Sequence, residues 1–386
     1  MLTKKEAISR AKELASLVKE EASNTEINGR VSDSVIDLFC EMELPQILTP
    51  KKFGGHEFDY RTFSGIISEI APISTSTAWV LSFYIGHNYI HALFPEQSQE
   101  EVFHQKPYSL TPGTIAPNFS LTPVDGGYIA NGTSQWNSGS SRADWFLNNG
   151  FIRTEGKPPE ARLFLVPMKD VQIIENWDVL GMRGTASYDI KLEDVYVPHH
   201  HIASTADVLN GNSPGSKIHE NPIYSMPLLP VIMGEVIPVV VGAYKGAAAT
   251  YRSFIQSKLT AYTGQKVATK QTAQIRVGKS EAGAQLAHSM LEDYIRDIDG
   301  LDINKWKSIE ARASCKARAS LIVDFCTQGV NDLILGAGAG SFRNDSPLQP
   351  FYRDLNMLRV HGLLDMEPST EVYGGILLGN EPSAIV

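Results

Sequence analysis

A histidine near the carboxyl end of the chain is the first residue whose type suggests chemistry. His361 is the next-to-last residue of the segment YRDLNMLRVHG, which follows a glycine-rich loop. No carboxylate lies between Asp354 and Asp365, so imidazole is the group of this segment that can hold or donate a proton. An imidazole does so near neutral pH, where a carboxyl group of ordinary pKa is already ionised. His361 could therefore donate a hydrogen bond or a proton, and a structural role at a domain contact is the alternative reading of the residue alone.

Two further histidines, His87 and His91, are four residues apart in a segment with helical character. This spacing can bring two imidazoles to one metal ion. No third ligand with a matching motif is apparent, and the intervening residues are Asn88, Tyr89 and Ile90 rather than the glutamate-containing pattern of zinc peptidases. We therefore predict no metal site.

A turn with two glycines lies in the string NWDVLGMRGTASYDIKLEDVYVP, residues 176–198. Gly181 and Gly184 allow the backbone to turn tightly and to approach a ligand closely. Thr185 and Ser187 follow two residues apart, which places both hydroxyl groups on one side of a strand. Such a turn can contact a bound molecule, although it is also compatible with a purely structural role.

These residues lie in a chain whose hydrophobic periodicity changes twice. From residue 2 to about residue 106, apolar residues recur with helical spacing, as in KEAISRAKELASLVKEEA. From about residue 108 to residue 201, short alternating segments separated by turns indicate strands. After a polar stretch rich in Gly, Ser and Pro, long helical patterns return. The predicted domains are therefore an N-terminal helical domain at 1–107, a central β domain at 108–204 and a C-terminal helical bundle at 205–386.

The composition is that of an ordinary globular chain and argues against several classes of partner. Of the 386 residues, 42% are hydrophobic, and the net charge of −9 comes without a basic stripe, so nucleic acid is not expected. The N-terminus has no signal-peptide core, and no apolar run reaches the roughly 20 residues of a membrane span. Cys40, Cys315 and Cys326 lack metal-ligand spacing, and the HHH at 199–201 is expected to form a solvated turn. We expect a cytoplasmic protein with reduced thiols.

Three strings resemble, in the same order, motifs of the acyl-CoA dehydrogenase superfamily, and in particular its branch of two-component flavin-dependent monooxygenases. The first is the string at 176–198, with its Gly-Met-Arg-Gly-Thr and Val-Pro. The second, NGTSQWNSGSSRADWF at 131–146, is similar to the segment that passes the flavin ring. The third, GAGAGSFRNDSPLQPFYRDL at 336–355, resembles a glycine-rich loop of the branch, although Pro350 stands where an arginine is usual. The resemblance implies an α+β fold with an N-terminal helical domain, a central β-barrel domain and a C-terminal four-helix bundle.

The resemblance also gives His361 a role. Acyl-CoA dehydrogenases of the commonest kind carry a proton-abstracting glutamate shortly after the Tyr-Arg-Asp segment, and here that place reads LRVHGLL. A histidine there is similar to the monooxygenase branch, in which reduced flavin and O2 form a C4a-(hydro)peroxyflavin. That species needs a proton on its distal oxygen and a dry cavity. The resemblance thus implies that His361 supplies the proton or hydrogen bond and that the Ser138 hydroxyl holds flavin N5.

The implied activity is that of an oxygenase component. It would take FMNH2 or FADH2 from a separate NAD(P)H flavin reductase, use O2 and oxygenate a small aromatic or heteroaromatic compound, phenolic or indole-like. It would form a homotetramer through the bundles, and a neighbouring subunit would complete the flavin site. Residues 203–226 are expected to help shape the pocket.

The resemblance assigns site residues in three groups. His87 would face the substrate as a base or hydrogen-bond partner, with a buried structural role as the alternative. The implied catalytic residues are His361, Ser138 and His87. The implied cofactor-binding residues are Trp136, Asn137, Ser138, Gly139, Arg183, Thr185, Lys258, Gly340, Ser341 and Arg343. The implied substrate pocket consists of His87, Trp79, Phe83 and Trp136.

Three other functions remain open at this point. An acyl-CoA dehydrogenase with bound FAD would need a displaced base, for which Glu235 and Glu281 are available. A member of the monooxygenase branch could oxygenate nitrogen or sulfur instead of a ring carbon. A flavin-free scaffold would retain three cofactor-facing motifs without using them.

Overall fold

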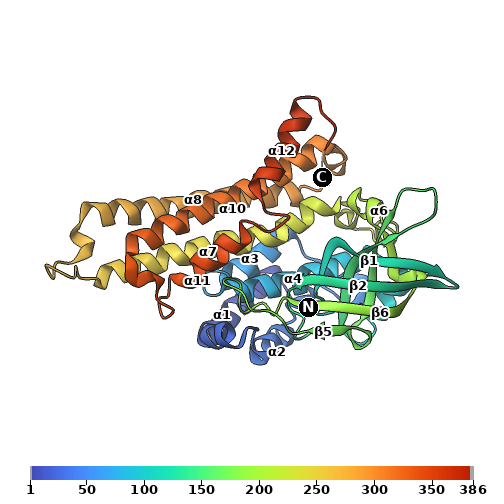
Figure 1. The fold of residues 1–386 in the computed structure, drawn as a ribbon, viewed down its shortest axis with the longest axis horizontal. Helices are drawn as coiled ribbons and strands as arrows, with labels where there is room; N and C mark the ends of the chain where they lie inside the picture. The colour runs from blue at the N-terminus through green and yellow to red at the C-terminus, as the bar shows by residue number, and fades with distance from the viewer. Residues whose placement is uncertain (1, 383–386) are drawn as a thin grey trace.

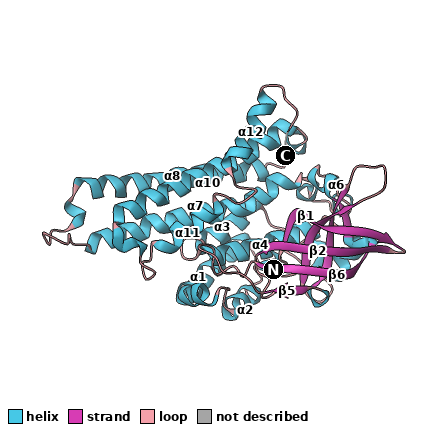
Figure 2. Ribbon diagram, in the orientation of Figure 1, coloured by secondary structure: helices cyan, strands magenta, loops and turns pink. Residues whose placement is uncertain are grey.

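The structure is a computed structural model that describes residues 2–382, and its elements follow the expected order of helices, strands and helices (Figure 1). Figure 2 shows the strands gathered at one end, with long helices extending away from them. This order confirms the predicted fold class. The N-terminal helices are α1 (Lys4–Asn28), α2 (Asp33–Glu41), α3 (Tyr60–Ile70), α4 (Thr75–His91) and α5 (Glu96–Val102).

The N-terminal helices begin where the sequence provides caps. Thr3 and Glu6 form a capping box at the start of α1. The side chains of Asp59 and Ser74 accept backbone N–H groups at the starts of α3 and α4. Every residue of α4 except Phe83 is buried, so this helix passes through the interior and can form the wall of a cavity.

The strands form one seven-stranded sheet in the order β5-β6-β2-β1-β3-β4-β7. Neighbouring strands are antiparallel except β1 and β3. Along β3 and β4, Phe146 and Phe164 pack in a core within the sheet, whereas Leu147 and Leu165 pack against the helices, as the two-residue period of a strand requires. The strands are β1 (Gly113–Val124), β2 (Gly127–Asn137), β3 (Trp145–Ile152), β4 (Glu160–Pro167), β5 (Gln172–Ile174), β6 (Tyr188–Pro198) and β7 (Ile202–Ser204).

The C-terminal helices form a bundle beside the sheet (Figure 1). By length and composition α7 could cross a membrane, but nearly all of its apolar segment is buried in the core of the bundle. The short helix α11 begins at the end of the bundle distant from the sheet and runs back toward α4, so it carries the segment after it to the junction of helices and sheet. The C-terminal helices are α6 (Thr205–Leu209), α7 (Leu228–Ser257), α8 (Gln271–Asp299), α9 (Ile303–Trp306), α10 (Ile309–Ala337), α11 (Gln349–Leu358) and α12 (Met366–Leu377).

The two predicted domain boundaries fall between elements. α5 ends at Val102 and β1 begins at Gly113, while β7 ends at Ser204 and α6 begins at Thr205. We therefore propose to divide the chain at 107/108 and 204/205.

Candidate functional site

A cavity of about 1040 Å³ lies where the N-terminal helices, the sheet and the bundle meet. Its walls come from α4, β1, β2, the turn before β6, α7 and the segment that follows α11. Most of the lining is apolar with a few polar groups, a composition typical of sites for cofactors and small organic molecules. All members of the predicted substrate pocket line it, namely Trp79, Phe83, His87 and Trp136.

One face of α4 supplies an aromatic wall. Trp79, Phe83 and His87 are successively four residues apart and therefore project from the same side of the helix. The ring centroids of Trp79 and Phe83 are 4.8 Å apart, and the Phe83 ring stacks on the imidazole of His87 at 5.1 Å. The wall thus runs from the indole of Trp79 to the imidazole of His87.

His87 presents a neutral hydrogen-bond acceptor to this cavity. Its Nδ1 lies 2.6 Å from the carbonyl oxygen of Thr111, so Nδ1 carries the proton and donates it there. Nε2 is then the acceptor. Burial lowers the pKa of His87 to about 4, so the ring is uncharged at neutral pH. This arrangement can accept a hydrogen bond from a hydroxyl or ring N–H.

Ser138 lies at the end of a row of hydroxyl groups. β2 and β6 pair with Asn137 opposite Tyr188, which brings the next residue, Ser138, beside Ser187. The Oγ atoms of these serines are 2.8 Å apart, and Ser187 Oγ lies 2.6 Å from Thr185 Oγ1. The predicted turn and the predicted strand segment therefore meet in one hydrogen-bonded row on the cavity wall.

The direction of this row follows from its ends, because each hydroxyl has a single proton. Thr185 donates to the carbonyl oxygen of Met182 at 2.9 Å, so it accepts from Ser187. Ser187 has then used its proton and accepts from Ser138, while Trp79 Nε1 donates to Ser138 at 3.1 Å. The Ser138 proton is thus directed to Ser187, and Ser138 can donate to a ligand only after its hydroxyl rotates.

Backbone strain surrounds the same row. Trp136, Met182 and Ala186 hold φ angles of 68°, 53° and 44°, in the left-handed region. Such non-glycine residues cost on the order of 1–3 kcal/mol each and cluster at functional sites. Trp136 and Met182 line the cavity, and the half-exposed Trp136 meets Trp177 edge to face with centroids 5.2 Å apart. The strain therefore shapes the mouth of the cavity.

His361 lies just beyond α11 and contacts the same tryptophan as Ser138. Its ring meets Trp79 edge to face, with 5.6 Å between centroids. Nδ1 accepts the backbone N–H of Leu363 at 3.3 Å, which places the ring proton on Nε2. Burial lowers the pKa of His361 to about 4. The resemblance implies that His361 supplies either a proton or a hydrogen bond. With this pKa, the residue at neutral pH offers a hydrogen bond from a neutral Nε2–H group rather than the proton of a charged imidazolium.

Three predicted cofactor residues lie near the cavity without lining it. The Asn137 amide donates to the carbonyl oxygen of Tyr188 at 3.0 Å and so ties β2 to β6. Gly139 has a φ of 84°, a conformation that favours glycine. Arg183 is half exposed, and its guanidinium lies 3.6 Å from Glu26. Contact of these residues with a cofactor stays a prediction.

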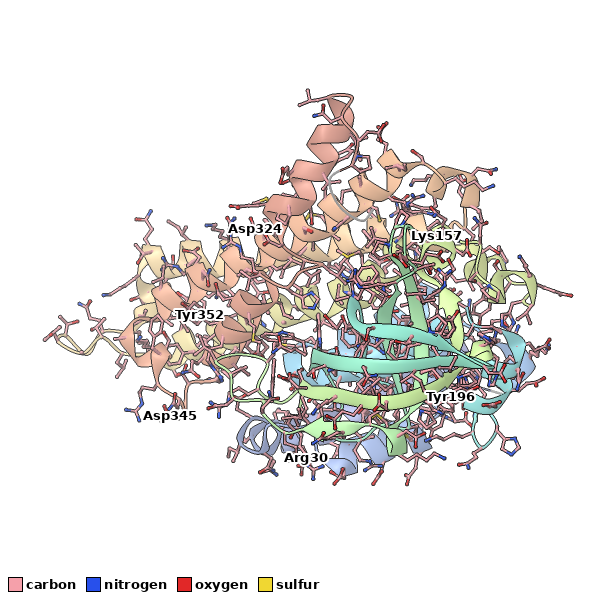
Figure 3. The ribbon with its side chains drawn as sticks, turned by 45° about the vertical axis from the view of Figure 1, so that its right-hand side comes forward. Arg30, Lys157, Tyr196, Asp324, Asp345 and Tyr352 are labelled. Carbon is pink, nitrogen blue, oxygen red and sulfur yellow. The ribbon has the colours of Figure 1, made fainter. Side chains whose placement is uncertain are left out.

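Four further predicted cofactor-binding residues, Lys258, Gly340, Ser341 and Arg343, lie near the ends of α7 and α10 and in the loop before α11. The Lys258 ammonium donates to the last backbone carbonyl of α10. Gly340, Ser341 and Arg343 belong to the loop before α11, where exposed Arg343 pairs with Asp345. Figure 3 labels Asp345 at the end of the bundle distant from the sheet. None of these four lines the cavity of its own chain.

The Arg-Asp pair of the YRDL segment ties the bundle to the β region, a role that sequence reasoning missed. Asp354 Oδ1 accepts the backbone N–H of Met182 at 2.5 Å, and Arg353 donates to the same turn at 2.6 Å. A Cβ on Gly181 would lie 2.4 Å from the Arg353 carbonyl oxygen, so this close approach requires glycine. Burial raises the pKa of Asp354 to about 7. The contact fixes the middle of α11 to the turn before β6, so it helps to position the segment after α11 that carries His361.

Two expectations about loops are wrong. His201, expected in a solvated turn, is buried, because α5 covers it: Nδ1 bonds to Ser98 and Nε2 lies 2.9 Å from Glu101. Residues 203–226 were expected to help shape the pocket, but none of them lines the cavity. Side chains of α4 and α7 form the walls in their place.

Only one of the two carboxylates considered as a displaced base lines the cavity. Glu281 lies on α8 and pairs with Arg252 at 2.8 Å, outside the lining. Glu235 lies on α7, lines the cavity and is almost wholly buried. A lone carboxylate within a long apolar helix was the sequence signal that could have singled out Glu235 for a site role.

Known proteins resemble this chain over nearly its whole length. Residues 236–366 match the family described as acyl-CoA dehydrogenase, C-terminal domain. A pigment production hydroxylase of Rhodococcus sp. is 37% identical over 377 residues, covering 98% of this chain and 97% of the relative. The flavin-dependent monooxygenase, oxygenase subunit HsaA, of Rhodococcus jostii is 30% identical, covering 92% and 94%. The crystal structure of the 3-HSA hydroxylase from Rhodococcus sp. RHA1 is 28% identical, covers 98% of both chains and superposes with a TM-score of 0.91.

Proposed function

This chain belongs to the flavin-dependent monooxygenases of the acyl-CoA dehydrogenase fold, and we propose that it is the oxygenase component that oxygenates a small aromatic or heteroaromatic compound. The enzyme uses reduced flavin and O2. A separate reductase that consumes NAD(P)H would supply the flavin, either as FMNH2 or as FADH2. An acyl-CoA dehydrogenase activity is not retained, because the relatives are monooxygenases and the place after the Tyr-Arg-Asp segment holds a histidine.

The observation that carries this proposal is the convergence of Ser138 and His361 on Trp79. The indole N–H of Trp79 donates to Ser138 at 3.1 Å, and its ring system meets that of His361 in a T-shaped contact, with 5.6 Å between the centroids. A hydroxyl group and a neutral imidazole donor thus come from chain segments more than 200 residues apart to one place in an apolar cavity. Two such donors suit the stabilisation of a flavin nitrogen and of the reacting oxygen.

The cavity also fits a flavin ring system by size and chemistry. Its volume of about 1040 Å³ is at the upper end of the roughly 300–1,000 Å³ usual for small-molecule sites, enough for a tricyclic ring and an arene together. When bound, reduced flavin supplies the electrons that activate O2. Ser138, with its hydroxyl rotated, would donate to the ring, and His361 Nε2–H would donate to the reacting oxygen. The apolar walls would exclude water.

The substrate would lie along the α4 wall. A phenol hydroxyl or a ring N–H would donate to Nε2 of His87, and its ring would pack against Phe83 and the α7 side chains. Because burial holds the pKa of His87 near 4, we assign it the role of hydrogen-bond acceptor rather than strong base. Product analysis is needed to distinguish oxygenation of a ring carbon from oxygenation of nitrogen or sulfur in the same cavity.

We further propose that the flavin site is completed within a homotetramer. Lys258, Gly340, Ser341 and Arg343 lie far from the cavity of their own chain, at the outer end of the bundle. In a homotetramer built through the bundles, these residues of a neighbouring copy would bind the flavin phosphate. Arg183 would contribute from the same chain.

The test is an anaerobic mixing experiment. Purified protein with chemically reduced FMN or FAD is mixed with oxygenated buffer, and flavin absorbance is followed in a stopped-flow instrument. We expect a transient spectrum that differs from those of reduced and oxidised flavin and persists for seconds. Immediate conversion to oxidised flavin with both cofactors would contradict the proposal. Product analysis with phenols, indoles, thiophenes and aromatic amines then identifies the atom that is oxygenated.

A further inference from the structure

A carboxyl group in the cavity wall has no role in the function proposed so far. Glu235 lies on α7, lines the cavity and is only 1% exposed. The surrounding segment, LLPVIMGEVIPVVVG, contains no other ionisable residue. A buried polar group needs a hydrogen-bond partner or a ligand, because its desolvation is costly.

The structure makes room for this carboxyl group and places one polar side chain, the hydroxyl of Tyr60, close to it. A Cβ on Gly86 of α4 would lie 2.3 Å from the carboxyl carbon of Glu235, so the glycine creates its space. Ser82 donates to the Glu235 backbone carbonyl at 2.6 Å, which joins α4 to α7 at this point. Glu235 Oε1 is nevertheless buried without a hydrogen bond, and so is the neighbouring hydroxyl of Tyr60.

Burial determines the charge of this group. Desolvation raises the pKa of Glu235 well above its ordinary value, and the Tyr60 hydroxyl opposes this only in part. No cation of residues 2–382 contributes to its pKa. An uncharged carboxyl group carries an O–H donor, and an apolar site can keep a carboxylic acid neutral so that it donates a hydrogen bond.

We propose that Glu235 forms a second polar subsite for the substrate and donates a hydrogen bond from its carboxylic acid to an oxygen substituent of the ring. This inference rests on the proposed function and narrows its substrate class to uncharged arenes with two oxygen substituents. His87 accepts a hydrogen bond from one hydroxyl group, and Glu235 donates to the other oxygen. His87 and Glu235 line the same cavity, and Gly86, which contacts Glu235, is next to His87 in α4. The two subsites are therefore at one level of the helix, about 12 Å along its axis from Trp79.

Charge limits the same substrate class. A carboxylate substituent would lose its hydration in a mostly apolar cavity, which is costly without a free cation. Lys316 also lines the cavity, but it already has an interaction of its own. We therefore expect a hydroxybenzoate to bind no better than phenol.

The experiment is calorimetric titration of the full chain with phenol, catechol, resorcinol, hydroquinone and 4-hydroxybenzoate, without flavin or O2 turnover. We expect at least one dihydroxybenzene to bind about tenfold more tightly than phenol, as one added buried hydrogen bond implies. Glu235→Met removes the donor at similar volume and should abolish this preference, so that the dihydroxybenzenes bind no more tightly than phenol. Glu235→Gln retains an N–H donor and should keep the preference.

Two controls make the result specific. Glu281→Met replaces a glutamate outside the cavity and should bind all five ligands as the wild type does. If the methionine variant does not fold, Glu235→Leu replaces it in the titration. Either change removes a buried unsatisfied group, so each variant should unfold at a temperature equal to or higher than that of the wild type.

Equal affinities of the wild type for phenol and all three dihydroxybenzenes would overturn the inference, and so would an unchanged preference in Glu235→Met. Failure of the proposed function is seen separately, in the oxygen-mixing experiment, which needs no substrate. A protein that shows the flavin transient but no preference for dihydroxybenzenes refutes only the Glu235 subsite.

Discussion

Trp79 illustrates what single residues contribute to this site. Its indole N–H donates to Ser138 while its ring packs against His361, so one side chain contacts both groups assigned to oxygen chemistry. The two donors differ in their freedom. His361 already has its proton on Nε2, whereas the proton of Ser138 is engaged by Ser187 until a ligand competes for it. This difference leads to two predictions at the residue scale.

His361→Ala should fold normally but lose coupling between flavin oxidation and product formation. Without the Nε2–H donor, the reacting oxygen is not stabilised, and more of the consumed O2 appears as hydrogen peroxide. Loss of one catalytic donor typically costs a factor of about 100–1,000 in rate. The ratio of peroxide to product per flavin oxidised measures this effect. His288→Ala, an exposed histidine on α8, is the control, and an unchanged ratio in His361→Ala would remove His361 from the mechanism.

Ser138→Ala and Ser187→Ala should have opposite effects on the lifetime of the oxygen-dependent flavin transient. Ser138→Ala removes the donor to the flavin ring and should shorten the lifetime. Ser187→Ala removes the group that accepts the Ser138 proton, so Ser138 becomes free to donate to the ring, and the lifetime should be equal or longer. Single-turnover decay measured in the stopped flow separates the two. Shortening of equal size in both variants would mean that the whole row, rather than Ser138, acts on the flavin.

At the scale of elements, the site depends on how α11 is attached to the turn before β6. α11 starts far from the cavity and reaches it only at its end, where His361 follows. Asp354, four residues before that end, attaches α11 to the backbone N–H of Met182, a residue that itself lines the cavity. Because Asp354 is buried with a pKa of about 7, this attachment should depend on pH.

Asp354→Asn should change how stability varies with pH. The pKa of Asp354 is about 7 in the folded state against an ordinary value of 3.8. As pH rises between these values, the unfolded chain loses the proton first, so wild-type stability falls. Asparagine does not titrate, so the variant lacks this loss of stability. The free energy of unfolding of the variant should therefore rise relative to that of the wild type between pH 4 and pH 8, by on the order of 4 kcal/mol. Urea unfolding at both pH values measures this, and an identical difference at both would contradict a raised pKa.

At the scale of the whole molecule, the bundle presents an apolar surface that a single chain does not cover. Exposed apolar residues belong to the bundle helices α8 and α10 (Figure 1). They are Ile275, Leu286, Leu321 and Leu335, each between 49% and 70% exposed. Exposed apolar residues that gather on one face can mark an association surface. This surface supports assembly through the bundles, the arrangement that would bring Lys258 and Arg343 of one copy to the cavity of another.

The double variant Leu321→Lys, Leu335→Lys should therefore dissociate. We expect the wild type to have four times the 42.4 kDa mass of one chain in light scattering after size exclusion, and the variant a smaller mass. The variant should also bind oxidised flavin more weakly, because its cavity loses the neighbouring phosphate ligands. Ile27→Lys, an exposed apolar residue on α1, is the control and should leave both quantities unchanged. A wild type that has the mass of one chain in light scattering and binds oxidised flavin no more tightly than the double variant would refute the tetramer.

The sequence by itself determined the order of the elements, the aromatic face of α4 and the motifs that name the family, because periodicity and short motifs are local properties of the chain. It also singled out His361, Ser138 and His87 as site residues. Only the tertiary structure decided which of these meet, since the Trp79 contacts join segments that are 59 and more residues apart. Burial, which no local pattern specifies, made His201 an interior residue and His361 a neutral donor, and it raised the pKa of Glu235 in the cavity wall.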